Sequence, residues 1–254
     1  MSDAADLLDS LLPAWSAHEP APAALAGQVS MAKAYEAQVE LLRRRVAQGA
    51  VHAGWKVGQT SAAMRAARGA TEPAPGFMLQ ANALDSGASL PLSDGDACFL
   101  EPELAIVMGS DLGGAEVTVD DVRHAAAGVA SAFEIVRRFD GWSDLALQRA
   151  VNGSTAGYVL GPMHAQCPEA AQLDDWQVRC TAGSEVLADV RGADANDNPL
   201  ETTAWLVRFL ARHQLALKAG QVVLTGTYAG LLPVAPGQAW RATIGPLAPV
   251  ALQT

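Results

Sequence analysis

Cysteine, aromatic residues and positive charge are scarce in this 254-residue sequence, and each shortage excludes a class of function. The three cysteines, Cys98, Cys167 and Cys180, form no Cys-x-x-Cys pair, which argues against a zinc–thiolate site and fits a reducing compartment. Aromatic residues make up 6% of the chain, too few for a base-stacking platform. The net charge of −10 argues against a nucleic-acid or acidic-membrane partner.

Several catalytic motifs are missing as well. The chain contains no Gly-x-Ser-x-Gly elbow, no Walker loop and no strand-to-helix Gly-x-Gly-x-x-Gly, and its five histidines are isolated. No apolar run approaches membrane-spanning length, and no basic-then-apolar signal pattern follows the acidic first residues. We therefore expect a soluble, cytoplasmic protein whose chemistry uses carboxylates, with a metal ion and Lys56 as candidate participants.

The hydrophobic periodicity predicts two helices before residue 50 and mainly strands after it. Residues 3–16 and 31–48 carry apolar residues at helical spacing, and Ser30 is a candidate N-cap for the second helix. The apolar stripe of that second helix is formed by Tyr35, Val39, Leu42 and Val46. Further elements are expected as helices at 62–68, 119–130 and 199–213, loops at 69–76 and 93–96, a hairpin at 176–190, and strands at 221–227 and 239–252.

These elements indicate an α+β protein with a mixed, largely antiparallel sheet. Strands outnumber helices after residue 50, and the helices are scattered among them rather than alternating with them. The chain is long enough to bury a sizeable core. We expect a helical N-terminal segment over residues 1–50 and a main domain over residues 51–254.

The stretch 99–108 is the most informative segment, because it is a strand-like apolar run that begins with two acids. Side chains alternate along a strand, so Glu101 and Glu103 share one face. The other face is expected to supply core through Leu104, Ile106 and Met108. Two neighbouring carboxylates on a buried strand repel each other and lose hydration, and a hard cation with oxygen ligands would relieve both penalties. The pattern alone leaves open the alternative of two solvated acids at a surface strand end.

Two further charged residues lie in apolar or glycine-rich strands. Glu134 is the only charge in the strand-like run 131–136 and therefore needs a partner. Lys56 stands between glycines in the run 51–61, where a ligand or another backbone could approach closely. The alternative for Lys56, a side chain that simply reaches solvent, stays open at this level.

Five segments of the sequence form a set of motifs that is informative when they are considered together. They are the glycine–lysine run 54–61, the Glu101-x-Glu103 strand, the run 133–136, and the turn-and-strand segments 153–161 and 220–227. Together they resemble the family of 2-keto-4-pentenoate and 2-oxohepta-4-ene-1,7-dioate hydratases, within the fumarylacetoacetate hydrolase superfamily. The resemblance extends from about residue 30 to the C-terminus, and five motifs in this order are specific to the family. It implies a β-roll or sandwich of the fumarylacetoacetate hydrolase C-terminal type behind the short helical segment.

The resemblance also implies a metal-assisted reaction. Glu101, Glu103 and Glu134 would hold Mg²⁺ or Mn²⁺, and a small 2-oxo or 2-hydroxydienoic acid would chelate it. The metal would stabilise an enolate, Lys56 would donate to a substrate oxygen, and water would add at the distal alkene carbon. Substrate contacts are expected from Leu104, Ser154, Thr225, Gly226 and Thr227.

The sequence departs from the family at three places. Ala74 stands where hydratases carry an aspartate that is a candidate proton carrier, Val151 replaces a second acid, and Asp197-Asn198 replaces a Gly-His pair. Three activities therefore stay open: hydration of a 2-hydroxy-2,4-dienoate, decarboxylation of a 2-oxo-3-enedioate (4-oxalocrotonate type), and a catalytically lapsed subunit that binds a 2-oxo acid. The resemblance further implies a homo-oligomer in aromatic hydrocarbon catabolism, with a paired pathway enzyme as a candidate partner.

Overall fold

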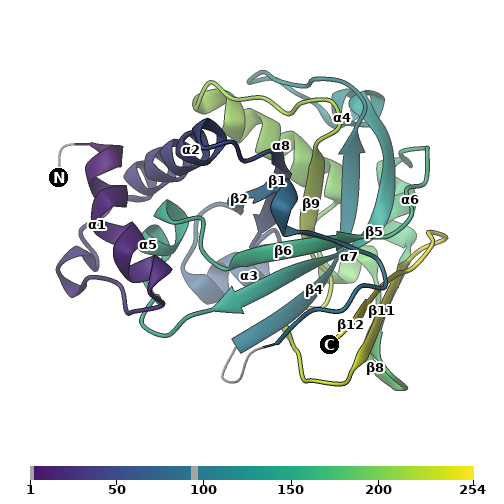
Figure 1. Ribbon diagram of the computed structural model, residues 1–254. Coiled ribbons are helices and arrows are strands. Elements are labelled where there is room, and N and C mark those ends of the chain that lie inside the picture. The colour runs from purple at the N-terminus through teal and green to yellow at the C-terminus, as the bar shows by residue number, and fades with distance from the viewer. Residues whose placement is uncertain (1–2, 93–96) are drawn as a thin grey trace.

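The computed structural model describes residues 3–92 and 97–254 (Figure 1). In this part of the chain, a sheet of eight strands runs through the centre and a sheet of four strands packs against it. The larger sheet contains, in spatial order, β2 (Ala74–Leu79), β1 (His52–Gly58), β9 (Val222–Thr227), β4 (Ala97–Met108), β5 (Ala126–Arg138), β6 (Thr155–Leu160) and β3 (Ala83–Asp85), with β10 (Leu232–Pro233) paired to β4. The smaller sheet contains, in spatial order, β12 (Val250–Gln253), β11 (Ala239–Ile244), β7 (Gln177–Ala182) and β8 (Glu185–Arg191).

The predicted α+β class with a mixed, mostly antiparallel sheet is confirmed. Within the described chain, β1 pairs with β9 and β3 pairs with β6 in parallel, while the other strand pairs are antiparallel. The hairpin expected at 176–190 is formed by β7 and β8. The long β4 and β5 pair from Ala97 to Met108, and this pairing sets the register of the candidate site.

The helices that the structure describes are α1 (Ala4–Ser16), α2 (Met31–Ala47), α3 (Ala62–Arg68), α4 (Val119–Ala125), α5 (Leu145–Ala150), α6 (Ala170–Asp175), α7 (Gly192–Ala195) and α8 (Pro199–Arg212), with 3₁₀ turns η1 (Ala23–Leu25) and η2 (Gln80–Asn82). Helices α1, α2 and α5 lie at one end of the larger sheet, and α8 packs over its strands (Figure 1). Ser30 caps α2 as predicted, because its hydroxyl accepts a hydrogen bond from the Lys33 N–H at 3.2 Å. None of the helices in the described ranges is long and apolar enough to cross a membrane.

One predicted helix is shorter than expected. The helix expected over 119–130 ends at Ala125, and Ala126 begins β5. The alanines in this stretch favour a helix when considered alone. Pairing of β5 with β4 overrides that local preference, because strand formation here depends on neighbouring strands rather than on the segment itself.

Two other expectations about local structure were also wrong. The loop expected over 69–76 ends before Ala74, which begins β2 and pairs with Gly58 of β1. Val46 of α2 is 47% exposed, although the helical stripe predicted that it would be buried. It lies in the last turn of α2, which extends past the surface that buries Leu42. The loop expected at 93–96 lies outside the described residues.

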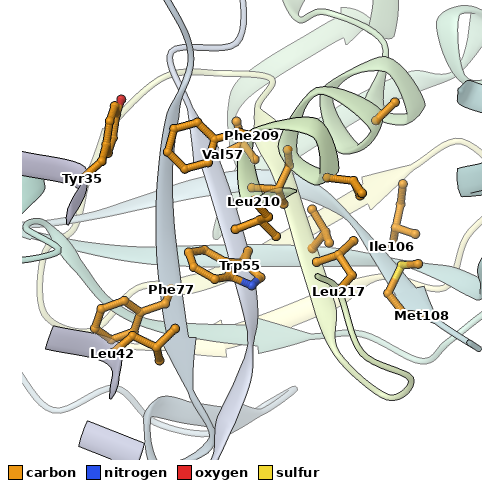
Figure 2. Packing of buried hydrophobic residues seen from close by; sticks show 14 of the residues in the cluster. Tyr35, Leu42, Trp55, Val57, Phe77, Ile106, Met108, Phe209, Leu210 and Leu217 are labelled. Atoms are coloured by element: carbon orange, nitrogen blue, oxygen red, sulfur yellow. The ribbon is translucent and has the colours of Figure 1, made fainter. Parts of the chain in front are cut away.

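The main core lies between the larger sheet and the helices that cover it (Figure 2). The three residues predicted to supply core from β4, Leu104, Ile106 and Met108, are each at most 1% exposed. Burying a side chain of this size contributes about 1.5–3 kcal/mol. The other labelled residues of the same cluster come from α2, β1, β2 and α8 and from the segment before β9: Tyr35, Leu42, Trp55, Val57, Phe77, Phe209, Leu210 and Leu217.

The N-terminal helices share this core. Helices α1 and α2 pack beside α5 at the left of Figure 1. Leu7, Leu8 and Leu11 of α1 are fully buried and belong to the same apolar cluster as Trp55 of β1. The domain boundary expected at residue 50 stays a prediction, and the helices before it contribute directly to the core of the sheet that follows.

Candidate metal centre

Three predicted glutamates converge on one side of the larger sheet. Glu101 and Glu134 are directly opposite each other in the antiparallel β4–β5 pair, and opposed residues in such a pair project to the same face. Glu103 lies two residues further along β4, so it shares that face. One carboxylate oxygen from each glutamate lies within 4.8 Å of the other two. Strand register therefore brings together residues that are more than thirty positions apart in the sequence.

Burial makes this cluster electrostatically unfavourable without a counter-ion. Glu103 and Glu134 are each 1% exposed, so the alternative of two solvated surface acids is wrong for Glu103. Burial, followed by repulsion from Glu134, raises the pKa of Glu101 to about 8. The same causes raise the pKa of Glu103 well above its ordinary value of 4.5. A cation bound between the carboxylates would reverse both effects.

Hydrogen bonds position the carboxylates but leave the cluster incompletely neutralised. The Thr155 hydroxyl donates to Glu134 Oε1 at 2.9 Å, and Lys56 Nζ lies 3.4 Å from the same oxygen. The Gly226 N–H donates to Glu103 Oε2 at 2.7 Å. Glu134 Oε2 is buried and accepts no hydrogen bond from the described residues. An orphaned buried oxygen beside two other carboxylates fits a hard divalent cation, which prefers oxygen ligands.

A tight turn at the end of β9 aims the Gly226 N–H at the cluster. Gly226 has φ = +99°, and a Cβ there would lie 2.4 Å from Thr60 Oγ1, so the position requires glycine. The Asn196 amide donates to the carbonyl oxygens of Thr225 at 3.2 Å and of Gly226 at 2.9 Å. It also accepts a hydrogen bond from the Thr60 hydroxyl. Asn196 could not be recognised from the sequence, because nothing in its local spacing distinguishes it from a polar loop residue.

Lys56 is held inside the protein rather than extended into solvent. Its residue is 9% exposed, and its ammonium is paired with Glu134. The glycines near it permit this placement. A Cβ on Gly54 would lie 1.9 Å from the Val222 carbonyl oxygen, and a Cβ on Gly76 would lie 2.9 Å from Lys56 Cε. The solvent alternative for Lys56 is therefore wrong, and the close approach expected from the glycines is confirmed by the neighbouring β9 backbone.

A pocket of about 260 Å³ opens beside the cluster. Its wall includes Lys56, Glu101, Ser154 and Ala74. Ala74, the position at which the family resemblance led us to expect an aspartate, thus lies at the candidate site. Val151, the position at which the second acid was expected, is buried and is absent from this wall among the described residues.

The other predicted substrate contacts occupy different places. Leu104 is fully buried in the main core, and its carbonyl oxygen accepts a hydrogen bond from the Thr225 hydroxyl at 2.9 Å. The Thr227 hydroxyl donates to the Gly230 carbonyl at 3.3 Å. Among the described residues that form the pocket wall, Ser154 is the one residue of this predicted group, while Leu104, Thr225, Gly226 and Thr227 are outside it. A contact from these four to a ligand stays a prediction.

A residue from the N-terminal segment supports the pocket wall. The Gln38 side chain of α2 donates to the Pro75 carbonyl at 3.1 Å and to Asn152 Oδ1 at 3.2 Å. Asn152 in turn accepts from the Phe77 N–H at 2.8 Å and donates to the Phe77 carbonyl at 3.0 Å. These bonds join α2, β2 and the turn that carries Ser154. Gln38 could not be recognised from the sequence, since a single polar residue on a helix gives no sign of a partner 114 positions away.

The fold and the pocket define a protein with an oxygen-rich candidate metal site and a lysine, built on a mixed sheet. Comparisons with known proteins identify the family. The profile described as fumarylacetoacetate (FAA) hydrolase C-terminal matches residues 47–251. The chain therefore belongs to the fumarylacetoacetate hydrolase C-terminal family.

Individual relatives agree with the resemblance seen in the five motifs. A 2-hydroxyhexa-2,4-dienoate hydratase of Comamonas testosteroni is 30% identical over 217 residues, covering 83% of this chain and 81% of the relative. A "TodF product hydratase" of Pseudomonas putida is 31% identical over 229 residues, covering 89% and 85%. The solved structure of 4-oxalocrotonate decarboxylase from Pseudomonas putida G7, complexed with magnesium and adipate, has a TM-score of 0.81 at 27% identity, covering 89% of this chain and 87% of that one. The resemblance to this hydratase family is confirmed.

Proposed function

We propose that the protein is a metal-dependent lyase that adds water to a 2-hydroxy-2,4-dienoate. The observation that carries the proposal is the buried cluster of Glu101, Glu103 and Glu134 beside Lys56, at the wall of a small pocket. The hydratase names of relatives that match most of this chain support the same reaction. The proposed substrate is a small 2-oxo or 2-hydroxydienoic acid.

Each residue has a definite proposed task. The three glutamates would hold Mg²⁺ or Mn²⁺ through carboxylate oxygens, and the orphaned Glu134 Oε2 supports this role. A bound divalent cation supplies Lewis-acid stabilisation for negative charge that develops on the substrate's 2-oxygen. Lys56 donates a hydrogen bond to a substrate oxygen or carboxylate and stabilises the same charge. Ser154 supplies a hydroxyl at the pocket wall to orient the acid.

Decarboxylation of a 2-oxo-3-enedioate is the second candidate, because Ala74 provides no acid at the pocket wall. Water addition needs a group that moves protons, whereas decarboxylation needs stabilised negative charge but no attacking water. The likeness to the 4-oxalocrotonate decarboxylase structure supports this candidate too. A subunit that binds a 2-oxo acid without turnover is the remaining possibility from the sequence.

One pair of assays separates the candidates. Purified protein with Mg²⁺ is given a 2-hydroxy-2,4-dienoate, and loss of the dienoate's ultraviolet absorbance reports hydration. Release of carbon dioxide from a 2-hydroxy-dienedioate reports decarboxylation. Turnover that disappears in Glu103→Ala supports catalysis at this cluster, whereas no turnover of either compound by the lone protein would favour the lapsed subunit.

The proposed assembly and location rest on the family resemblance. We propose a cytoplasmic homo-oligomer that functions in aromatic hydrocarbon catabolism, with a paired pathway enzyme as a candidate partner. Val51 and Met163 are exposed and line the same surface hollow, so they are the apolar residues expected to be covered in an assembly. Light scattering on the purified chain tests this proposal, and a monomer at micromolar concentration would contradict it.

A further inference from the structure

Positive charge dominates the wall of the pocket beyond the metal cluster. Arg68 of α3, Arg138 at the end of β5 and Arg149 of α5 line the pocket together with Lys56. Glu101 is the one carboxylate among the described residues of that wall. Lys56 is paired with Glu134 and lies beside the candidate metal cluster, to which Glu101 belongs. The three arginines therefore form a separate cationic part of the pocket.

Arg149 differs from the other two because it is buried. It is 9% exposed, whereas Arg68 and Arg138 are exposed at the rim. Burial lowers the pKa of Arg149, and interaction with the Tyr35 hydroxyl opposes this change. In the described chain, no carboxylate lies within ion-pair distance of its guanidinium. A buried guanidinium without a carboxylate partner carries a desolvation cost, and a bound anion would offset part of that cost.

Arg149 lies where its guanidinium could contact a ligand in the pocket. It is the penultimate residue of α5, and the following turn carries Ser154 to the same pocket wall. Guanidinium groups bind carboxylates through two parallel hydrogen bonds, so a single buried arginine can fix the orientation of a ligand carboxylate. A pocket of about 260 Å³ suits a small acid.

We propose that Arg149 binds a second carboxylate of the substrate, so that the site selects a 2-oxo dicarboxylic acid over a monocarboxylic one. The inference rests on the proposed function, which assigns the first carboxylate and the 2-oxygen to the metal cluster and Lys56. Arg68 and Arg138 at the rim raise the local concentration of a dianion. A purely structural arginine that holds Tyr35 is the competing explanation.

A chain-matched pair of ligands separates the two explanations. 2-Oxoadipate and 2-oxohexanoate have the same number of carbons and the same 2-oxo acid group, and they differ by the distal carboxylate. Both are titrated calorimetrically into the purified full chain with Mg²⁺. A charge-assisted hydrogen-bond pair corresponds to about a 10–100-fold preference for 2-oxoadipate.

The variants Arg149→Met and Arg149→Lys complete the experiment. We expect the Met variant to bind 2-oxohexanoate within about twofold of the natural chain while losing the preference for 2-oxoadipate. The Lys variant keeps the charge but not the planar fork, so it should retain a smaller preference. Arg179→Met is the matched control, because this exposed arginine pairs with Asp189 on the smaller sheet, away from the pocket.

The outcomes distinguish this inference from the proposed function. Equal affinity of the natural chain for the two acids overturns the role of Arg149 while leaving the proposed function intact. If the substitutions lower the affinity for both acids equally, Arg149 is a structural residue, and the inference is overturned as well. Binding of neither acid to the folded, Mg²⁺-loaded chain overturns the proposed function and this inference with it. If the Met variant does not fold, the preference for 2-oxoadipate over 2-oxohexanoate in the natural chain and in the Lys variant decides whether the inference holds.

Discussion

Raising the pH from 5 to 8 should destabilise the metal-free protein, and Mg²⁺ should remove most of that loss. The cause is the glutamate cluster, in which burial raises the pKa of Glu101 to about 8 and that of Glu103 well above 4.5. Between pH 4.5 and pH 8 the folded chain holds a proton on Glu101 that the unfolded chain has already released. The folded state therefore binds more protons, and the free energy of unfolding falls as the pH rises.

The magnitude follows from the pKa of Glu101. A pKa that rises from 4.5 in the unfolded chain to about 8 in the folded chain corresponds, without screening by water, to a loss on the order of 5 kcal/mol in the free energy of unfolding. Glu101 lines the pocket, and water there weakens the effect, so we expect about 3 kcal/mol. For a chain of this length, that loss lowers the melting temperature by roughly 6–12 °C. A bound divalent cation requires ionised carboxylates, so its stabilising effect should grow with pH.

Thermal melts at pH 5, 6, 7 and 8, with a chelator or with Mg²⁺, measure how the melting temperature depends on pH and on the metal. Glu101→Gln should reduce the pH dependence of the metal-free melts, because one of the two carboxyls with a raised pKa is gone and its repulsion of Glu103 is gone with it. Glu116→Gln is the matched control, since Glu116 is an exposed acid outside the cluster. A metal-free melting temperature that stays constant or rises between pH 5 and 8 would refute the reasoning, as would an equal Mg²⁺ effect at both ends of that range.

Three further substitutions test separate parts of the site. Gly226→Ala should cost about 2 kcal/mol or more, because its φ is +99° and the new Cβ meets Thr60; an unchanged urea midpoint would contradict this. Thr155→Val removes the hydroxyl that donates to Glu134 and should weaken Mg²⁺ binding by about 10-fold, measured by calorimetry. Ala74→Asp places an acid at the pocket wall and should raise the hydration kcat by about 100-fold if proton transfer limits it, without a comparable gain in decarboxylation.

The glutamate cluster could be predicted from local signals in two strands together with the family resemblance. Alternation along β4 places Glu101 and Glu103 on one face whatever the partner strand is, and the apolar run around Glu134 marks it as buried. Family resemblance joined the two strands before their register was known. The convergence within 4.8 Å then follows from pairing of Glu101 with Glu134.

The parts that could not be predicted depend on distant contacts. Residues 126–130 are rich in alanine and favour a helix, but pairing with β4 and a bridge from Val129 to His164 make them a strand. Asn196 and Gln38 acquire their roles from partners in other elements, which no sequence spacing reveals. Arg149 is similar, because its significance comes from burial beside a pocket whose other walls are built by distant segments of the chain.

The two hydrogen bonds from Gln38 have a consequence for engineering this protein. The family profile begins at residue 47, so a chimera assembled at that boundary would exchange the sheet without α2. The Pro75 carbonyl and the Asn152 side chain would then lose the donor that joins them. Domain swaps among such lyases should therefore move the N-terminal helices and the sheet together, as one inherited unit.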